Sequence, residues 1–368
     1  DIFVGDDEPI VVTLPGDATG KVTITVDGSS YSIVNLVYVD EAVDYVNGDK
    51  TIELDLGGVS FTYVLPEVIL ESTVDGETVQ TPYETLEEAV EEAESGDKII
   101  VIGAAVSEIT EETELAENVT ISSFDGTKIT TGEDSVKITA SSDGTVNLVE
   151  GTLTATPAAG STGTGVTVNV NDATVTAGEE ITVSTDNGGQ VTTTVATTEV
   201  IISPDGDPNH TVKYVGCDAN TTYGLDSGEL TTEDRVEITS GTEYDLKVQL
   251  GAKETTVETN SSNEGVTTVT KGTDVNGNDT VVVESTKAND NITVNAGGGA
   301  IEYTTSEDNT KLVISEDTKD VVLKEGGVDV PKNGSISLPS GEKITNTADG
   351  SENITVSSDG SVQIPDGG

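Results

Sequence analysis

Residues 81–123 read TPYETLEEAVEEAESGDKIIVIGAAVSEITEETELAENVTISS, and this stretch carries the one helix signal in a chain of strands and turns. Its apolar residues recur at helical spacing, at Leu86, Ala89, Val90 and Ala93. Thr85 is placed to cap the helix, and Glu88 is placed to complete a capping box. Gly96 predicts a left-handed stop at the other end. We therefore expect a short amphipathic helix near residues 85–95.

A β-branched run follows this helix, with Ile, Ile, Val and Ile at 99–102 and Val, Thr and Ile at 119–121. The order T-L-E-E-A-V-E-E-A-E-S-G-D-K-I-I-V, followed by N-V-T-I, resembles the N-terminal entry of pectin-lyase-like parallel β-helix proteins. The resemblance implies that the helix caps the first coil and covers the apolar end of the stack. It implies no activity, because that fold serves enzymes, adhesins and structural proteins alike.

The chain as a whole predicts an all-β protein with three domains. Residues 1–70 alternate cleanly around an Asp27-Gly28 turn, which predicts a small antiparallel domain. Its phrase LPGDATGKVTITVDGSSYS resembles the immunoglobulin-like repeats of archaeal and bacterial surface proteins, which implies an Ig-like β-sandwich. Residues 71–203 predict a β-helix or β-arch solenoid with the capping helix. Residues 204–368 predict a β-rich assembly domain, for which a sandwich and a solenoid remain equal alternatives.

Two breaks rich in turn residues are candidate boundaries between these domains. Residues 154–165 read TATPAAGSTGTG, and residues 204–208 read PDGDP. Clusters of Pro, Gly, Ser and Thr are typical of loops. The three-domain division places its second boundary at 203/204, and the first break is either a boundary or a surface flap.

Composition excludes several classes of function. The formal charge is −52, from 68 acidic and 16 basic residues, and Arg235 is the only arginine. A chain with so few cations cannot replace phosphate counterions, so we expect no nucleic-acid partner. No apolar run is long enough to predict a membrane span. The chain starts at Asp1 and has no Met, which predicts a processed start and a secreted protein on the extracellular cell surface.

Few residues suit catalysis or covalent linkage. His210 is the only histidine, and it lies in the turn-rich segment PDGDPNHT. Trp is absent and Phe occurs three times, whereas carbohydrate-active β-helix enzymes line their clefts with aromatic and basic groups. We therefore expect no enzyme. Cys217 stands alone, so it forms either a buried thiol or an intermolecular disulfide.

Two loops have oxygen ligands at alternate positions, as hard cations such as calcium prefer. The first set is Asp205, Asp207 and Asn209, and the second is Asp274, Asn276, Asn278 and Asp279. Neither loop has the Glu that completes an EF-hand, so an Asx-rich turn is the alternative interpretation. Calcium is the one cofactor that the spacing suggests.

Eight N-x-S/T sequons are candidates for glycosylation in a secreted chain. They begin at Asn118, Asn209, Asn220, Asn260, Asn278, Asn291, Asn333 and Asn353. The chain is rich in Ser and Thr, so accidental sequons are the alternative.

Three functions are compatible with these features. The first is a structural subunit of an extracellular sheath, surface layer or filament, whose partners are copies of itself joined through strand edges. The acidity, the lone Cys, the absent Met and the β-modules are similar to archaeal surface proteins, such as the sheath or surface-layer proteins of methanogens. The second is an adhesin that binds glycans of the cell envelope. The third is a carbohydrate-active enzyme.

Overall fold

The computed structural model describes residues 11–13, 35–37, 51–55, 60–64, 68–83, 85–101, 108–122, 127–141, 145–158, 165–230, 235–295, 300–316, 321–338, 340–347 and 352–365. These residues are built from strands in large sheets with one α-helix, which confirms the all-β class. The chain divides into two compact units, Asp1–Ser161 and Thr162–Gly368. The division falls within the segment 154–165 that the sequence marks as a break, whereas residues 204–208 form part of the turn between two paired strands.

Before residue 68 the described residues form four short strands, which are β1 (Val11–Thr13), β2 (Asn35–Val37), β3 (Thr51–Asp55) and β4 (Ser60–Val64). β1 pairs with β2 in parallel, and β3 pairs with β4 as an antiparallel hairpin. The predicted Ig-like domain depends on residues 1–70, and most of these lie outside the described residues. In the described ranges no helix is long and apolar enough to cross a membrane.

The predicted helix is present as α1 (Leu86–Glu92). The Thr85 side chain accepts a hydrogen bond from the Glu88 backbone N–H at 3.2 Å, which confirms the predicted N-cap. Leu86, Ala89 and Val90 are buried. The predicted stop at Gly96 is wrong, because the helix ends at Glu92 with Ala93 in an extended conformation. Gly96, at φ +90°, instead turns the chain into the next strand.

The other strands of the first unit form two ladders around this helix. One ladder has the order β6 (Glu77–Tyr83), β5 (Val68–Val74), β7 (Lys98–Val101), β9 (Thr120–Ser122), β10 (Lys128–Thr131), β13 (Thr152–Thr156). The other has the order β8 (Ile109–Leu115), β11 (Val136–Ala140), β12 (Val146–Glu150). The helix contacts β8 of one ladder and β5, β6 and β7 of the other. It therefore covers apolar strands of both ladders, as a capping helix should.

The pairing in this unit differs from that of a regular parallel β-helix. Among its described pairs after residue 67, only β7–β9 is parallel, and the other pairs are antiparallel. Successive coils of a β-helix stack as parallel strands, and a parallel connection needs a long crossover. The short turns of this chain favour hairpins instead, so parallel stacking is limited to β7–β9 in this described segment.

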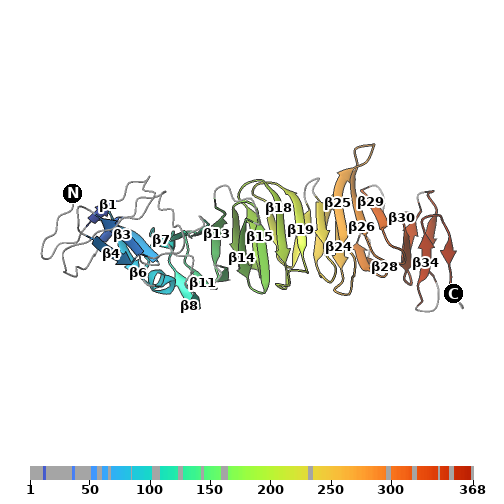
Figure 1. Ribbon diagram of the computed structural model, residues 1–368. Coiled ribbons are helices and arrows are strands. Elements are labelled where there is room, and N and C mark those ends of the chain that lie inside the picture. The colour runs from blue at the N-terminus through green and yellow to red at the C-terminus, as the bar shows by residue number, and fades with distance from the viewer. Residues whose placement is uncertain are drawn as a thin grey trace. The chain divides into compact units, whose positions relative to one another are not determined.

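The second unit consists of one long sheet and a facing layer formed by strands of two further sheets, and the chain builds the two layers alternately (Figure 1). The first sheet has the order β14 (Val166–Val170), β15 (Ala173–Ala177), β18 (Thr197–Ser203), β19 (Val212–Cys217), β22 (Arg235–Ile238), β25 (Thr267–Thr273), β26 (Asp279–Ser285), β29 (Thr310–Ser315), β30 (Val322–Glu325), β32 (Ser335–Ser337), β33 (Lys343–Thr345). The facing sheet begins with the ladder β16 (Ile181–Ser184), β17 (Gln190–Thr193), β20 (Thr222–Gly224), and η1 (Asp186–Gly188) joins its first two strands. It continues with β21 (Ser227–Leu230), β23 (Asp245–Leu250), β24 (Lys253–Thr259), β27 (Asn291–Asn295), β28 (Ala300–Thr305), β31 (Gly327–Val330), β34 (Ile354–Ser357), β35 (Val362–Gln363).

The core of the second unit lies between these sheets. Alternate residues of each strand are buried, as in β14, β23 and β29, and strand β23 contacts β26 across the interface. The core side chains are mostly Val, Ile and Leu. On the outer face threonines align across strands, for example Thr182, Thr192 and Thr222. The hydroxyl oxygens of Thr192 and Thr222 lie 2.8 Å apart, a cross-strand pair that stabilises the sheet.

A recurring hydrogen-bonded turn, which we call the turn lock, closes several crossings between sheets. Its turn holds an Asn in the left-handed region, at Asn118, Asn220 and Asn289, with φ between 57° and 67°. The residue after this Asn donates its backbone N–H to a buried Thr at the end of a neighbouring strand. That Thr donates its hydroxyl to the carbonyl two residues before the Asn. The three buried hydroxyls belong to Thr131, Thr193 and Thr305.

The lock around Thr193 illustrates the geometry. The Thr221 N–H donates to Thr193 Oγ1 at 3.2 Å, and Thr193 Oγ1 donates to the Asp218 carbonyl at 2.5 Å. A related turn at Asn333 uses Asn346, with the Asn333 N–H donating to the Asn346 carbonyl at 2.8 Å. Each lock satisfies backbone groups that would otherwise be buried without partners where the chain leaves a sheet.

Candidate functional site

The turn between β18 and β19 contains the only histidine of the chain. His210 Nδ1 lies 2.7 Å from Asp205 Oδ2, and the two side chains are 32% and 56% exposed. The other oxygen of Asp205 accepts the Asp207 N–H at 3.0 Å. Because Asp205 uses one oxygen for the backbone and one for the imidazole, it holds both the turn and the ring in place.

The neighbouring residues form an Asx turn of their own. Asp207 Oδ1 accepts the Asn209 N–H at 2.9 Å and Asn209 Nδ2 at 2.8 Å. Ser203 Oγ donates to the His210 carbonyl at 2.9 Å. Both Asp205 oxygens and Asp207 Oδ1 thus accept hydrogen bonds from within the segment, so the three residues are arranged as a hydrogen-bonded turn.

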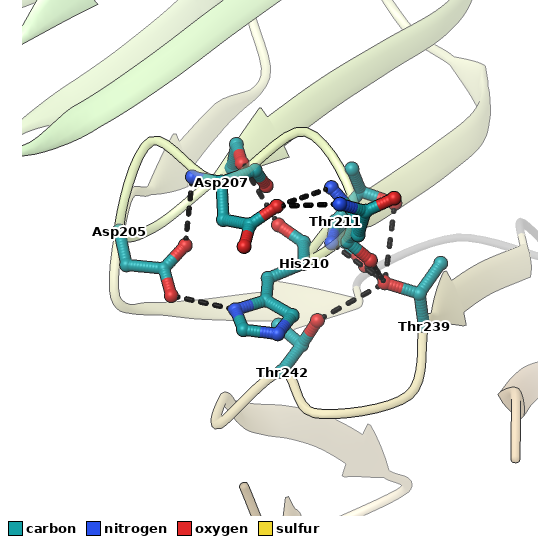
Figure 2. Close-up of polar contacts among 8 residues, drawn as sticks. Asp205, Asp207, His210, Thr211, Thr239 and Thr242 are labelled. Atoms are coloured by element: carbon teal, nitrogen blue, oxygen red, sulfur yellow. Dashed lines mark hydrogen bonds and ion pairs between the residues drawn. The ribbon is translucent and has the colours of Figure 1, made fainter. Parts of the chain in front are cut away.

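A second turn, at residues 239–242, packs against this one (Figure 2). Thr239 Oγ1 accepts the Thr211 N–H at 2.7 Å and donates to the Asn209 carbonyl at 2.7 Å. The imidazole lies directly against Gly241, where a Cβ would come within 2.7 Å of His210 Nε2. Gly241 also has φ +80°, so both backbone geometry and the ring require glycine there.

The electrostatics of the turn follow from these contacts. The hydrogen bond to Asp205 raises the pKa of His210 above its usual value, and the same bond lowers the pKa of Asp205. Hydrogen bonds from Asn209 lower the pKa of Asp207. The ion pair is therefore favoured near neutral pH, and its exposure to water keeps its contribution small. The ion pair fixes the imidazole within its own turn, where the ring packs against Gly241 of the next turn.

The second predicted cation loop, at residues 274–279, is the tip of the β25–β26 hairpin. Asp274 accepts the backbone N–H groups of Asn276 and Asn278 at 2.7 and 2.9 Å, and Asn278 Nδ2 at 3.0 Å. These bonds lower the pKa of Asp274. Asp279 Oδ2 faces away from the tip, where it accepts the Gly251 N–H at 3.1 Å. The structure therefore does not gather the four predicted ligands around one point.

Across the described ranges, no group of three or more His, Cys, Asp or Glu side chains is placed to hold a metal ion. In both predicted loops, aspartate oxygens instead accept hydrogen bonds from backbone N–H groups of the same loop. A calcium ion would have to displace these internal hydrogen bonds. The calcium hypothesis stays a prediction.

Cys217 lies in the core at 3% exposure, beside a cluster of three tyrosines. Its thiol contacts the Tyr214 carbonyl at 3.6 Å. The rings of Tyr214 and Tyr223 lie 4.1 Å apart, and the hydroxyls of Tyr214 and Tyr244 are 2.8 Å apart. A disulfide between chains would need this region to open, so the geometry matches the buried-thiol alternative.

Seven of the eight sequon asparagines are exposed, and Asn278 is half-buried. Asn118, Asn220 and Asn333 occupy left-handed turn positions. Others use their carboxamides internally, since Asn209 donates to Asp207 and Asn291 accepts from Thr304. Asn260 accepts from the N–H and hydroxyl of Ser262. Attachment of a glycan at the turn positions breaks the fewest of these side-chain bonds.

The C-terminal end of the second unit exposes apolar side chains that sequence reasoning did not identify. Val362 in β35 lies opposite Val356, which is fully buried, so both side chains lie on the core side of the sheet. Val362 is nonetheless 38% exposed, and Ile364, on the same side, is 63% exposed. We call Ile344, Val362 and Ile364, with strands β33 and β35, the C-terminal rim.

The rim includes the last described strand of each sheet. Among the described residues, β33 pairs with β32 and β35 pairs with β34. In the β32–β33 hairpin the Leu338 N–H donates to the Glu342 carbonyl, and the Asn346 N–H donates to the Gly334 carbonyl. Since hydrogen-bonded and non-bonded pairs alternate in antiparallel ladders, the Thr345 N–H points away from β32.

No family model, curated protein or solved structure matches this chain.

Proposed function

We propose that this chain is a structural subunit of an extracellular sheath, surface layer or filament, and that copies join through strand edges. The observation that carries the proposal is the C-terminal rim, where two strand edges flank apolar side chains that face the core side. Unpaired strand edges are templates for another chain, and exposed apolar side chains favour burial against a partner.

One other edge of the described sheets opposes indiscriminate stacking. β8, the terminal strand of its ladder, exposes Glu111, Glu112 and Glu114. Charged side chains on an edge strand oppose pairing. The net charge of −52 likewise opposes random aggregation. An acidic chain with a small apolar rim is suited to ordered assembly.

The same proposal includes the Ig-like and β-arch assignments and the extracellular location. It also includes the likeness to archaeal sheath and surface-layer proteins. An Ig-like domain at residues 1–70 and β-arch stacking after it would give a β-rich building block throughout. Secretion agrees with the acidic composition, and the sequons agree with an extracellular chain. The buried Cys217 leaves assembly to the strand edges, without a disulfide.

A proline at the rim tests the proposal. Thr345→Pro removes a backbone N–H that faces away from β32, so it spares the hairpin while blocking a new strand. Thr345→Ala removes the same side chain and keeps the N–H. Sedimentation velocity over a wide concentration range, with electron microscopy of the same samples, should show wild type and Thr345→Ala forming larger species. Thr345→Pro should associate at least about fivefold more weakly, the loss of about one hydrogen bond.

Three results would count against the proposal in whole or in part. A wild-type chain that stays monomeric at every concentration, with and without calcium, would refute self-assembly. A monomer that instead binds cell-envelope glycans would favour the adhesin. Equal association of the proline and alanine variants would exclude the edge of β33 as the contact.

A further inference from the structure

We infer that the outer face of the long sheet in the second unit packs against the same face of a second copy. This inference rests on the proposed function, and it adds a contact between sheet faces to the contact between strand edges. The face consists of the outward side chains of strands β18, β19, β22, β25, β26, β29 and β30. Its most apolar part, which we call the valine row, is Val282, Val313 and Val322 on three neighbouring strands.

The valine row points away from the core. Val283 and Leu312 are buried between the layers, so their neighbours Val282 and Val313 project from the opposite side of the sheet, where they are partly exposed. Val282 lies opposite Val313, and Val313 lies opposite Val322. The three side chains therefore form one continuous apolar strip across β26, β29 and β30.

The facing layer has no such strip among its described residues. Its outward positions hold polar and charged side chains, for example Thr256, Thr293 and Thr355. Threonine and valine are both favoured in strands, so strand propensity alone does not explain why one face uses valine and the other does not. The long sheet also places Ile201 and Val215 on its outer face. Apolar side chains gathered on one face favour burial against a partner.

The two faces also differ in charge. Within these strands, the outer face of the long sheet carries as many cations as carboxylates, namely Lys213, Arg235, Lys311 and Lys324 against Glu199, Glu237, Glu284 and Glu325. Among its described side chains, the outer face of the facing layer carries Lys247 against Glu229, Asp245, Glu254, Glu258 and Asp329. Because the whole chain has a charge of −52, two copies repel each other least where each presents a face without net charge. Charge therefore selects the same face of a second copy over the facing layer as the partner.

Cations of this face pair with carboxylates of the same face. Lys311 Nζ lies 2.9 Å from Glu284 Oε1, and each of the two residues is two positions from a valine of the row on its own strand. The pair therefore borders the valine row directly. Two more such pairs are Lys213–Glu199 and Arg235–Glu237. An apolar centre surrounded by polar groups that already have partners is the usual anatomy of a protein interface.

The size of the face indicates how strong the contact is. Seven strands at the usual spacing span about 30 Å, and four to five residues along each strand span about 15 Å. Two such faces bury about 900 Å², which is the size of a weak contact. Two copies that use one patch are related by a two-fold axis, so this contact by itself stops at a dimer. The strand edges of the proposed function would then join the dimers into larger species.

Val313→Lys tests the face contact, and Thr293→Lys is its matched control. Both substitutions add one cation to a partly exposed, outward position in a strand, but on opposite layers of the unit. In sedimentation velocity, Val313→Lys should weaken self-association at least about tenfold, because the change is present in both copies of a symmetric contact. Thr293→Lys should leave it unchanged. In a Thr345→Pro background, which blocks the edge of β33, the chain should stop at a dimer, and adding Val313→Lys should give a monomer.

Thiol protection supplies a second measurement that keeps the charge of the face. Val313→Cys and Thr293→Cys are alkylated at increasing protein concentration, and peptide mapping separates the introduced thiol from the buried Cys217. Alkylation at position 313 should slow as the chain associates, whereas alkylation at position 293 should not. Circular dichroism checks that each variant is folded. Val313→Thr keeps the shape and strand preference of valine, and it should weaken association in the same direction if Val313→Lys disturbs the sheet.

The outcomes separate this inference from the proposed function. Equal association of Val313→Lys and Thr293→Lys would overturn the face contact and leave assembly to the strand edges. A thiol at position 313 that is already protected in the dilute monomer would also overturn it, because the chain itself would then cover the face. An effect of Val313→Lys without an effect of Thr345→Pro would support the face contact and exclude the edge of β33. A wild-type chain without any self-association would overturn both proposals.

Discussion

Removing the hydroxyl of Tyr244 should destabilise the second unit more than removing the hydroxyl of Tyr214. Both phenols are 1% exposed. Tyr244 donates to the Gly224 carbonyl at 2.9 Å, so its single proton is used there. The 2.8 Å contact between the two hydroxyls therefore has Tyr214 as the donor and Tyr244 as the acceptor. The two substitutions remove different parts of this chain of bonds.

The expected magnitudes follow from which groups lose a partner. Tyr214→Phe removes one hydrogen bond and leaves Tyr244 bonded to Gly224, which costs about 1 kcal/mol. Tyr244→Phe removes the bond to Gly224 and leaves the Tyr214 hydroxyl buried without an acceptor, which costs about 3 kcal/mol. In the double variant no orphaned hydroxyl remains. Its cost should be about 2 kcal/mol, below the sum of the single costs.

Hydrogen exchange in β19 and β23 is the appropriate assay, because a chain of two compact units need not unfold in one step. Exchange should accelerate about fivefold for Tyr214→Phe and at least about a hundredfold for Tyr244→Phe, as these free energies require. Equal effects of the two single substitutions, or additive effects in the double variant, would refute the assigned donor direction.

The same phenols predict an alkaline transition. Burial raises the pKa of Tyr244 well above its ordinary value, and it raises that of Tyr214 in the same direction. A folded pKa above the unfolded one means that the stabilisation is complete below pH 10 and is lost as pH rises beyond it. Absorbance of tyrosinate should show these two phenols ionising only with unfolding, and ionisation before any loss of circular dichroism would contradict their burial.

Three further predictions concern the turns. The NMR resonance of His210 should titrate above pH 6.5, and Asp205→Asn should lower the pKa of the imidazole. Because the folded pKa is raised, the stabilisation by the ion pair is full below pH 6.5 and is lost as pH rises through the folded pKa. An unchanged titration in Asp205→Asn would refute the pairing. Thr193→Val should lower the free energy of unfolding by about 2–3 kcal/mol, because the backbone N–H and carbonyl of the turn lock lose their partner. Thr192→Val, on the outer face, should lower it by less than about 1 kcal/mol. Hydrogen exchange in β17 compares the two variants, and equal losses would contradict the turn lock. Gly241→Ala should displace the imidazole and lower the melting temperature, and a variant with an unshifted histidine resonance would show that the ring does not rest on this turn.

Sequence alone identifies the local elements of this protein well. The capped helix near Thr85 and the strand-and-turn rhythm depend on neighbouring residues, so the pattern contains the information. The choice between parallel and antiparallel pairing cannot be predicted from neighbouring residues, because it depends on which distant strand each segment meets. The resemblance to β-helix proteins predicts the capping helix correctly, but the strands that follow the helix pair mostly in the antiparallel direction.

The site residues show the same limit for a different reason. Asp205, Asp207 and Asp274 have the spacing of cation ligands, yet the same spacing builds Asx turns, and only the observed hydrogen bonds distinguish the two. Thr193 cannot be selected among many threonines from sequence, because its role depends on a turn 28 residues away. Ile364 matches any core residue in its strand pattern, and its exposure is visible only in the structure.

The turn locks have a consequence for how such a protein can change its length. Each lock closes one crossing with its own short set of bonds, so a crossing does not depend on the layers further along. Insertion or deletion of a whole hairpin pair would then shift the reach of the second unit by about 10 Å, two strand spacings, while preserving the chemistry of its last layer. Descendants of one ancestral chain could differ in span and still keep the same last layer.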